Sequence, residues 1–469
     1  MVSFFALLSF LPNIAPGGLG KSEMSSAISA DAISPSLIQD GNVINLPYLL
    51  LQKASISIFG LSLYSIKLPS IIIAVLTALF IILILNRWFK SDVAIVGSIL
   101  STLSTAFLFL AGSGTPTIMI VFWLSVILWL GSKIVGNKNI HPMLVFSFVF
   151  CVALSLYTPH LFYVALGIGI AGIAHPHLRF ALKQLKPYQL IFSMLIFAIS
   201  IAPLIVGCIC KPSIISQLIF TQNFSLGNFA RNISDAFAPL FSFGLVYDSI
   251  YLAPLFGLAN IIFVIFGILA SIGKLFTSRN TVVSLLTIFA ILVSGLNQDI
   301  ALSIIIPIAV LSTAGLESLI EKWHTLFPEN PYAHIIGTLP IIVIVLTIII
   351  SGLAHFIFGY HYTPRVAKNF DNDITIIQEH ISSNDILVVS ENQENYDFYK
   401  LLEQYNHFTI MSEPPEQIDG DGRIALLGMP SNDKTLKLKE IITSPKSRNS
   451  DRLYIYEKVA ATETAEKGE

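Results

Sequence analysis

Charged residues are unusually scarce in this sequence. Only 12% of its 469 residues are Asp, Glu, Lys or Arg, whereas about 25% is usual for a soluble domain. The deficit is concentrated between Leu68 and Phe358, in long apolar runs, many of which contain no charge at all. A very apolar soluble core would need alternating polar faces, which these runs lack. The sequence therefore predicts a polytopic α-helical membrane protein.

Two other shortages narrow the chemistry. The three cysteines do not form a four-ligand zinc pattern, and Cys208 and Cys210 are too close in sequence for an unstrained disulfide. We therefore expect free thiols. The net charge of −2 gives no signal for nucleic-acid binding, and no glycine-rich phosphate loop is present. No cofactor is predicted, and the use of a divalent metal stays open.

The apolar runs predict about eleven transmembrane helices, because about 20 helical residues span the hydrocarbon core of a bilayer. The predicted spans are 2–15, 68–86, 93–111, 116–135, 143–158, 160–174, 188–208, 252–272, 281–297, 300–318 and 334–357. The stretch Ile44–Ile66 is amphipathic and interrupted by Lys53, so we expect it to lie in the interface plane instead.

Basic residues predict the orientation, since they fall in every second loop, as an excess of Lys and Arg does on the cytoplasmic side. The short turns between those loops contain neither residue. This pattern predicts a multi-pass plasma-membrane protein with a cytoplasmic N-terminus. The long loops 16–67 and 209–251, and the chain after about residue 358, are then outside.

The composition becomes polar after Tyr362, which ends the predicted membrane domain, residues 1–362. Predicted strands and helices alternate in the following segment, so a small extracytoplasmic α/β domain is expected over 363–458. Residues 459–469 are expected to be a disordered tail. The predicted helices are Asp371–Ser382, Tyr396–Gln404 and Lys434–Ile442, and the strands are Ile386–Ser390, Phe408–Met411, Arg423–Gly428 and Leu453–Glu457.

Asp, Glu, Lys and Arg are absent from the centres of the predicted helices, which argues against an ion-coupled transporter or a proton pump. Acidic residues gather in the predicted outer segments instead, which favours chemistry at the outer interface. These residues are Glu23, Asp31, Asp40, Asp235, Asp248 and Asp299.

Glu23 is the first candidate catalytic residue, because a carboxylate held beside a membrane can act as a general base. The alternative is a structural residue at a helix N-terminus, favoured there by the helix dipole and near Ser22 as a cap. Asp31 is the second candidate. It lies eight residues further along, about 80° around a helix axis, so it can share a site with Glu23. Both interpretations of Glu23 stay open.

Four short motifs follow one another near the start of the chain. In this order and spacing the sequence resembles the GT-C superfold of membrane glycosyltransferases, in particular its protein O-mannosyltransferase and aminoarabinose-transferase-like branch. The motifs lie within residues 1–130, and the resemblance beyond them is one of topology. They are Ser22-Glu23, Asn45-Leu46-Pro47-Tyr48-Leu49, Phe59-Gly60-Leu61-Ser62 and Lys67-Leu68-Pro69-Ser70.

Three departures from the family pattern leave the activity open. The family's acidic pair is usually Asp-Glu, with the aspartate as the proposed base, but this chain has Ser22 at that position. An acidic residue is common at the outer start of the fourth helix, where residues 112–117 contain none. A basic residue often precedes the late proline-containing helix, where residues 297–299 read Asn-Gln-Asp. An altered acceptor, a mechanism based on Glu23 and a lapsed enzyme all stay possible.

The resemblance implies a polyprenyl-phosphate sugar donor and transfer to a glycan, lipid or protein acceptor on the outer face. The partners are then this donor, membrane lipids and the acceptor. Lys211 and Arg231 are the candidate donor-binding residues, since a donor phosphate at headgroup depth would attract them. They can equally be interfacial anchors. The rival function is a non-catalytic membrane scaffold or lapsed relative of the same fold, and a transporter is less favoured.

Overall fold

The structure is a computed structural model of the chain. It describes all residues except 1, 15–16, 34–42, 137–139, 220–225, 238–244, 248–249, 253–257, 275, 297–301, 327–330, 363–368, 383–384, 390–394, 407, 414–422, 428–429, 431–435, 444–451 and 459–469.

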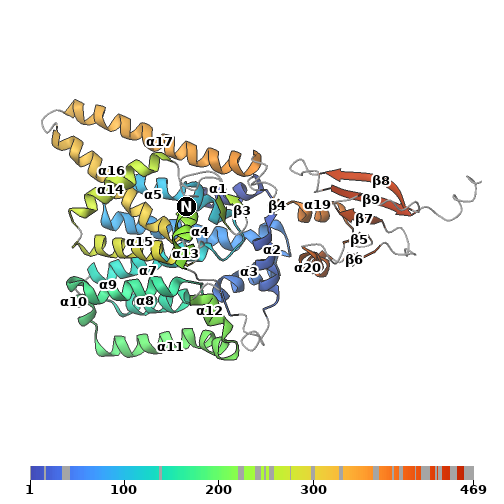
Figure 1. The fold of residues 1–469 in the computed structure, drawn as a ribbon, viewed down its shortest axis with the longest axis horizontal. Coiled ribbons are helices and arrows are strands. Elements are labelled where there is room, and N and C mark those ends of the chain that lie inside the picture. Colours follow the sequence, from blue (N-terminus) through green and yellow to red (C-terminus); the bar gives the residue numbers. More distant parts are fainter. Residues whose placement is uncertain are drawn as a thin grey trace, which may run out of the picture.

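Long apolar helices form the larger part of the molecule (Figure 1). Within the described residues, five helices are long and apolar enough to cross a membrane. They are α4 (Leu63–Trp88), α7 (Ile118–Gly136), α11 (Pro187–Cys210), α16 (Ile305–Leu326) and α17 (Pro331–Tyr362). The shorter apolar helices outside the first long loop are α1 (Val2–Ile14), α8 (Pro142–Ser155), α14 (Leu258–Ile272) and α15 (Ser278–Ser294).

Two apolar segments are bent pairs of helices. The first pair is α5 (Ser91–Thr102) and α6 (Thr105–Gly112), bent by 56° where Ser104 caps the second helix. The second is α9 (Leu161–Ala174) and α10 (Pro176–Lys183), bent by 91° at Pro176, which cannot continue the first helix. Only the first pair corresponds to one predicted span, since α10 lies beyond the predicted span 160–174. The eleven predicted spans correspond to α1, α4, α5 with α6, α7, α8, α9, α11, α14, α15, α16 and α17.

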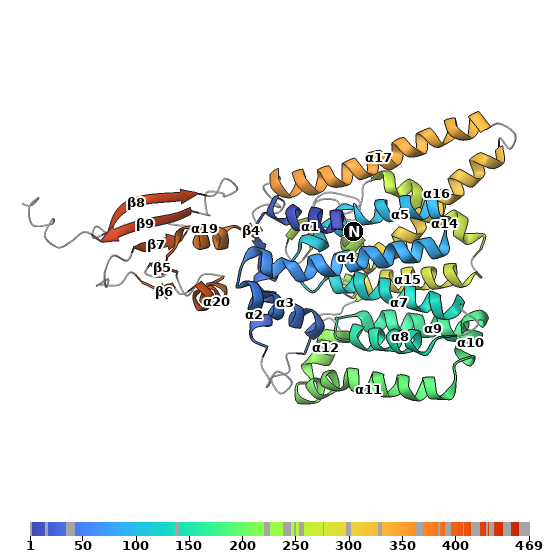
Figure 2. The ribbon, with the colours of Figure 1, turned by 180° about the vertical axis from the view of Figure 1, so that it is seen from behind.

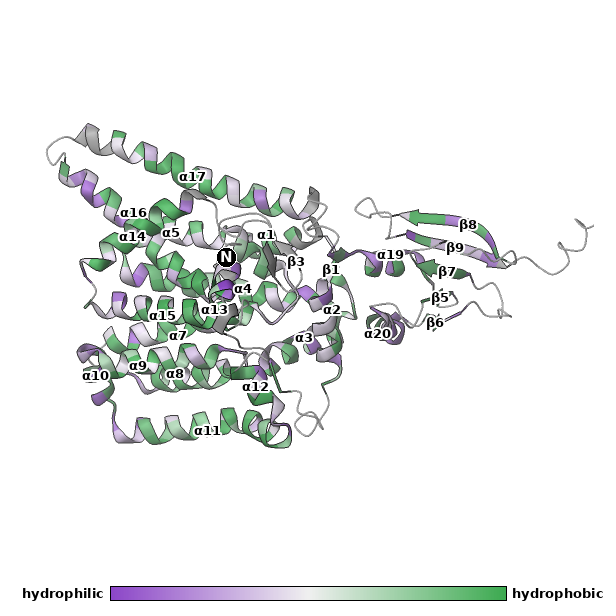
Figure 3. Cartoon of the chain, viewed as in Figure 1, coloured by the Kyte–Doolittle hydropathy of each residue, from purple (hydrophilic) through white to green (hydrophobic). Residues whose placement is uncertain are grey.

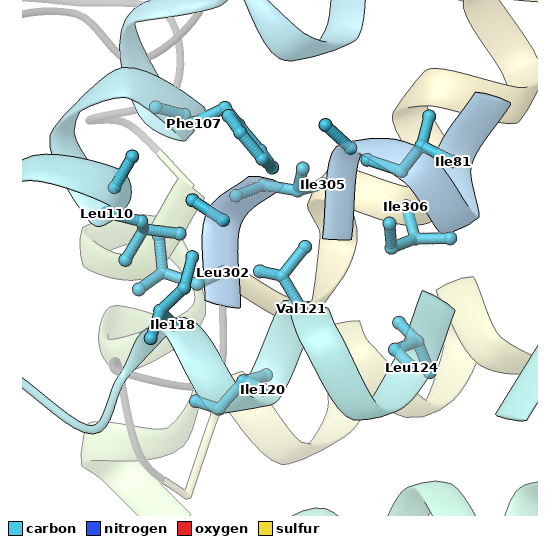
Figure 4. Packing of buried hydrophobic residues seen from close by; sticks show 14 of the residues in the cluster. Ile81, Phe107, Leu110, Ile118, Ile120, Val121, Leu124, Leu302, Ile305 and Ile306 are labelled. Carbon is cyan, nitrogen blue, oxygen red and sulfur yellow. The ribbon is translucent and has the colours of Figure 1, made fainter. Parts of the chain in front are cut away.

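α4 is the central helix, and it packs against α1, α5, α6 and α7. Its apolar side chains meet those of α6, α7 and α16 in the main core (Figure 4). The contacting residues include Ile81, Phe107, Leu110, Val121, Leu124, Ile305 and Ile306. The main apolar core of the bundle therefore lies beside α4.

α14 and α16 approach each other more closely than ordinary side chains allow. A Cβ added at Gly267 would lie 1.9 Å from the carbonyl oxygen of Leu311, and one at Gly315 would lie 1.9 Å from that of Phe263. Small residues let helix backbones meet in this way where the hydrophobic effect does not drive helix pairing. The two glycines therefore fix the packing of α14 on α16.

The outer helices of the bundle turn apolar side chains away from the protein. Only 17% of the spanning window of α11 and 11% of that of α17 is buried. Figure 3 shows mostly hydrophobic residues along the helices of the bundle and a more mixed pattern in the C-terminal domain. Such faces suit lipid tails, so the composition and the fold agree that this is a multi-pass membrane protein.

The two long loops contain secondary structure of their own. The first holds β1 (Leu19–Gly20), α2 (Lys21–Asp31) and α3 (Leu46–Phe59). The second holds α12 (Ser213–Ile219), α13 (Leu226–Phe237), β2 (Leu245–Tyr247) and β3 (Ile250–Leu252). The predicted interfacial stretch is thus mostly α3, but α4 begins at Leu63, five residues before the predicted span. Lys67 consequently lies inside a membrane helix.

The C-terminal domain is a five-stranded sheet with the order β6-β5-β7-β9-β8. β5 is parallel to β6 and β7, and β9 is antiparallel to β7 and β8. The bounds are β5 (Ile386–Val388), β6 (Thr409–Met411), β7 (Ile424–Leu427), β8 (Leu436–Thr443) and β9 (Arg452–Lys458), with helices α19 (Asp373–His380) and α20 (Tyr396–Asn406). The predicted α/β fold is confirmed, while the tail 459–469 lies outside the described residues.

One predicted element of this domain is wrong. Lys434–Ile442 was expected to be a helix, but Leu436–Thr443 is the edge strand β8, paired with β9. Its Leu, Lys and Glu residues favour a helix in isolation. Cross-strand pairing with β9 overrides that preference, and the exposed charges of β8 suit an edge strand.

The domain sits at one end of the bundle, against α2 (Figures 1 and 2). β4 (Phe370–Asp371) pairs antiparallel with β1, so that Leu19 faces Asp371 and Gly20 faces Phe370. One apolar cluster combines side chains from both parts. The first loop and the start of α4 supply Leu19, Met24, Ala27, Ile56, Leu61 and Ile66, and the domain supplies residues such as Ile374, Ile377, Phe398 and Leu402. The domain and the first loop therefore share a core.

Candidate functional site

Glu23 lies at the N-terminal end of α2 and is enclosed by polar partners. Its Oε2 accepts a hydrogen bond from the backbone N–H of Gly20 at 2.6 Å, and its Oε1 accepts one from that of Gly114 at 2.6 Å. The ammonium of Lys67 lies 3.5 Å from Oε1 and donates to the carbonyl oxygen of Gly18 at 2.8 Å. The side chains of Glu23 and Lys67 are 3% and 1% exposed.

Local sequence explains why Glu23 takes this position. It is the third residue of α2, and its side chain reaches back to the N–H of Gly20, which caps the helix. A negative charge is also favoured at a helix N-terminus. Both oxygens of the carboxylate have partners, and removing either charge would break a buried ion pair.

Gln52 extends this network to α3. Its amide nitrogen donates to the carbonyl oxygens of Ile66 at 3.1 Å and Gly114 at 3.0 Å, and its amide oxygen accepts from Ser26 at 2.7 Å. We call Glu23, Gln52, Lys67 and Gly114 the Glu23 anchor. The anchor joins α2, α3, the start of α4 and the loop between α6 and α7.

Gly114 was not singled out from the sequence, because its contribution is a backbone N–H. A larger residue at this position would crowd its neighbours. A Cβ there would lie 2.9 Å from Cγ2 of Ile66 and 3.3 Å from Oε1 of Glu23. The loop in which the family commonly has an acidic residue thus offers a donor to Glu23 here.

Asp31 ends α2 and has a different environment. It is half-buried, and its Oδ1 accepts a hydrogen bond from the hydroxyl of Tyr405 at 2.7 Å. Tyr405 lies on α20 of the C-terminal domain. The ammonium of Lys53 donates to the backbone carbonyls of Asp31, at 3.2 Å, and of Ile33. In the part of the chain that the structure describes, Oδ2 of Asp31 has no hydrogen-bond partner.

The two predicted donor-binding residues lie in the second loop. Lys211 is exposed and follows the last residue of α11. Arg231 is on α13, and its Nε lies 3.6 Å from a carboxylate oxygen of Asp235. Within the described ranges, neither basic residue forms an ion pair with Glu23 or Asp31. Their predicted role stays a prediction.

The remaining predicted features are quickly placed. Asp40, Asp248 and Asp299 lie outside the described residues. Cys151, Cys208 and Cys210 are free thiols. Among described residues, no group of three or more His, Cys, Asp or Glu side chains is arranged to hold a metal ion.

Comparison with known proteins identifies the fold. The family model described as dolichyl-phosphate-mannose-protein mannosyltransferase matches residues 47–206, a range that contains Gln52, Lys67 and Gly114 of the anchor. A search of curated protein sequences finds no match.

Solved structures match over nearly the whole chain. Apo ArnT from Cupriavidus metallidurans has a TM-score of 0.52 at 10% identity, with 97% of each chain covered. The same protein bound to undecaprenyl phosphate has a TM-score of 0.51, with the same identity and coverage. The apo oligosaccharyltransferase of Archaeoglobus fulgidus has a TM-score of 0.50 at 12% identity, covering 88% of this chain and 64% of that chain. The chain therefore has the GT-C fold that its sequence predicted.

Proposed function

We propose that the protein is a membrane glycosyltransferase that moves a sugar from a polyprenyl-phosphate donor to an acceptor. Two comparisons support this activity. The matched family is named for mannosyl transfer from dolichyl phosphate. One structure of the same fold, ArnT, binds undecaprenyl phosphate.

The observation on which the proposal rests is the Glu23 anchor. It ties the first long loop, whose motifs resemble the family's, to the start of α4 and the loop after α6. A buried, hydrogen-bonded ion pair costs desolvation and is weak evidence for stability alone. The ion pair instead fixes the geometry of the first loop. Catalysis requires acid–base groups that are held in place relative to the donor.

Glu23 and Asp31 stay the candidate catalytic carboxylates, and the geometry favours different roles for them. A general base must reach the proton that it removes. Both oxygens of the buried Glu23 already accept hydrogen bonds or face Lys67, which favours a positioning role. Asp31 keeps one oxygen without a partner among the described residues, which favours the base.

Lys211 and Arg231 stay the candidates for the donor phosphate. Both are exposed and follow the outer end of α11, where a polyprenyl phosphate would present its headgroup. The proposed setting is the plasma membrane, with the N-terminus in the cytoplasm and the C-terminal domain outside.

Donor turnover tests the activity. Purified protein in nanodiscs would be incubated with radiolabelled polyprenyl-phosphate sugars and an envelope extract as the acceptor. We expect labelled product and free polyprenyl phosphate in equal amounts. The alternative, a non-catalytic scaffold, predicts neither product. Ser22 in place of the family's aspartate would then indicate an enzyme that has lost its activity. A cytoplasm-dependent fluorescent reporter fused after Lys368 should stay dark, and fluorescence would refute the orientation.

A further inference from the structure

Asp31 and Tyr405 are 374 positions apart in sequence but form a 2.7 Å hydrogen bond. Asp31 belongs to the first loop of the membrane domain, and Tyr405 to helix α20 of the C-terminal domain. α2 packs directly on α20, so this bond lies within an extended contact. The C-terminal domain thus supplies a group to one of the two candidate catalytic carboxylates.

The surroundings of Asp31 hold it in place without closing it. Lys53 donates to two carbonyls in the last turn of α2 and the residues after it, which fixes the backbone that bears Asp31. Within the described residues no ion pair joins Lys53 to the Asp31 carboxylate. Asp31, Lys53 and Tyr405 are all half-buried, so solvent reaches part of each side chain.

Tyr405 is suited to act as a hydrogen-bond donor. Burial and the neighbouring Asp31 carboxylate raise the pKa of Tyr405 to about 12. Its hydroxyl therefore keeps its proton at neutral pH, and that proton points to Oδ1 of Asp31. Oδ2 is left as the oxygen that can accept a proton from a substrate.

We propose that Asp31 is the general base, and that Tyr405 is a positioning residue contributed by the C-terminal domain. This inference rests on the proposed glycosyltransferase function. The acceptor site then lies at the junction of α2, α3 and α20, and it takes a molecule with a free hydroxyl group.

The proposed reaction is a displacement at the anomeric carbon of the donor sugar. The acceptor oxygen forms a bond to the anomeric carbon of the donor sugar, and its proton passes to Oδ2 of Asp31. The bond between that carbon and the phosphate oxygen breaks, and its electron pair leaves with the polyprenyl phosphate. Asp31 later releases its proton to water.

The test uses the full-length protein in nanodiscs with a polyprenyl-phosphate sugar and the envelope extract. Asp31→Asn should lower kcat by at least about a hundredfold, the range of general-base catalysis. Tyr405→Phe should lower kcat by about tenfold, equivalent to about 1.4 kcal/mol, as expected for one lost hydrogen bond, and leave the donor KM unchanged. In the Asp31→Asn background, Tyr405→Phe should have no further effect, because the two residues act as a unit.

The matched control is Gln378→Ala. Gln378 donates to the carbonyl oxygen of Leu61, so its loss removes another hydrogen bond of the same domain interface without touching Asp31. This variant should keep the wild-type kcat, whereas a loss equal to that of Tyr405→Phe would reduce Tyr405 to a docking residue and refute the proposal.

The outcomes separate this inference from the proposed function. Wild-type kcat in Tyr405→Phe or in Asp31→Asn would overturn the inference and leave the glycosyltransferase in place. A wild-type protein that transfers no sugar from any polyprenyl phosphate would overturn the function, and the inference with it.

Discussion

The two ends of α2 offer the same chemical group in opposite settings. At its start, the Glu23 carboxylate is enclosed by two backbone N–H groups and the ammonium of Lys67. At its end, the Asp31 carboxylate is half-buried and held through one oxygen by Tyr405. The helix is eleven residues long, so both carboxylates sit on one rigid element. This difference is the basis for the roles that we propose, with Glu23 holding the loop and Asp31 acting as the base.

The largest loss of folding stability should come from a change at the start of α2, where Glu23 is enclosed. Glu23→Gln places an amide N–H₂ against one of the two backbone donors and removes the negative charge that faces the buried ammonium of Lys67. Breaking a buried pair in this way costs about 3–5 kcal/mol. Denaturant unfolding of the purified protein in detergent measures this loss.

Asp31→Asn is the matched control at the open end, since an asparagine oxygen can still accept from Tyr405. We expect a loss of under about 1 kcal/mol in the free energy of unfolding, as for most substitutions outside a core.

The double variant Glu23→Met with Lys67→Met should recover part of the stability lost in Glu23→Gln, because it removes both charges. Equal destabilisation by Glu23→Gln and Asp31→Asn would break the comparison.

A smaller effect is expected at the glycine that completes the anchor. Gly114→Ala forces a methyl group to within 2.9 Å of Ile66 and 3.3 Å of Glu23. Overpacking of this kind costs about 1–3 kcal/mol. Gly169→Ala in α9 is the control, because an added Cβ there meets nothing within 4 Å. Similar stability of the two variants in the same unfolding assay would contradict the close approach of Gly114 to Ile66 and Glu23.

The effects outside α2, at the predicted phosphate ligands, should be on donor binding and not on stability. Lys211→Ala should weaken donor binding by about tenfold or more, the loss of one charged hydrogen bond. Arg231→Ala should cost less, because its exposed guanidinium already faces Asp235 and exposed pairs contribute about 0.2–1 kcal/mol. The donor KM of each variant measures these changes. Unchanged KM in both would make these residues interfacial anchors.

Much of the fold could be predicted from the sequence, since a bilayer demands long apolar runs and those runs are visible one by one. The C-terminal strands and helices followed from local patterns, with one exception. Lys434–Ile442 has the composition of a helix but forms β8, because β9 offers it a partner. That partner lies further along the chain and leaves no local signal.

The site was harder to predict, for a reason visible in single residues. The positions of Glu23 and Asp31 after the first helix made them candidates. Lys67 stood out only as part of a family motif, and that motif gave no sign of a contact with Glu23. Gly114 acts through its backbone, so its side chain gives no sign of the contact. Tyr405 meets Asp31 only because β1 pairs with β4 and the domain docks on α2. Such tertiary pairings leave no mark in a single sequence.

The most direct test compares sugar transfer by Glu23→Gln and Asp31→Asn, each normalised to the amount of folded protein. Glu23→Gln should give less folded protein, but the remaining folded molecules should keep most of the wild-type turnover. Asp31→Asn should fold normally and lose at least about a hundredfold in turnover, the loss expected for a missing general base. The reverse result, a folded but inactive Glu23→Gln beside an active Asp31→Asn, would contradict the account.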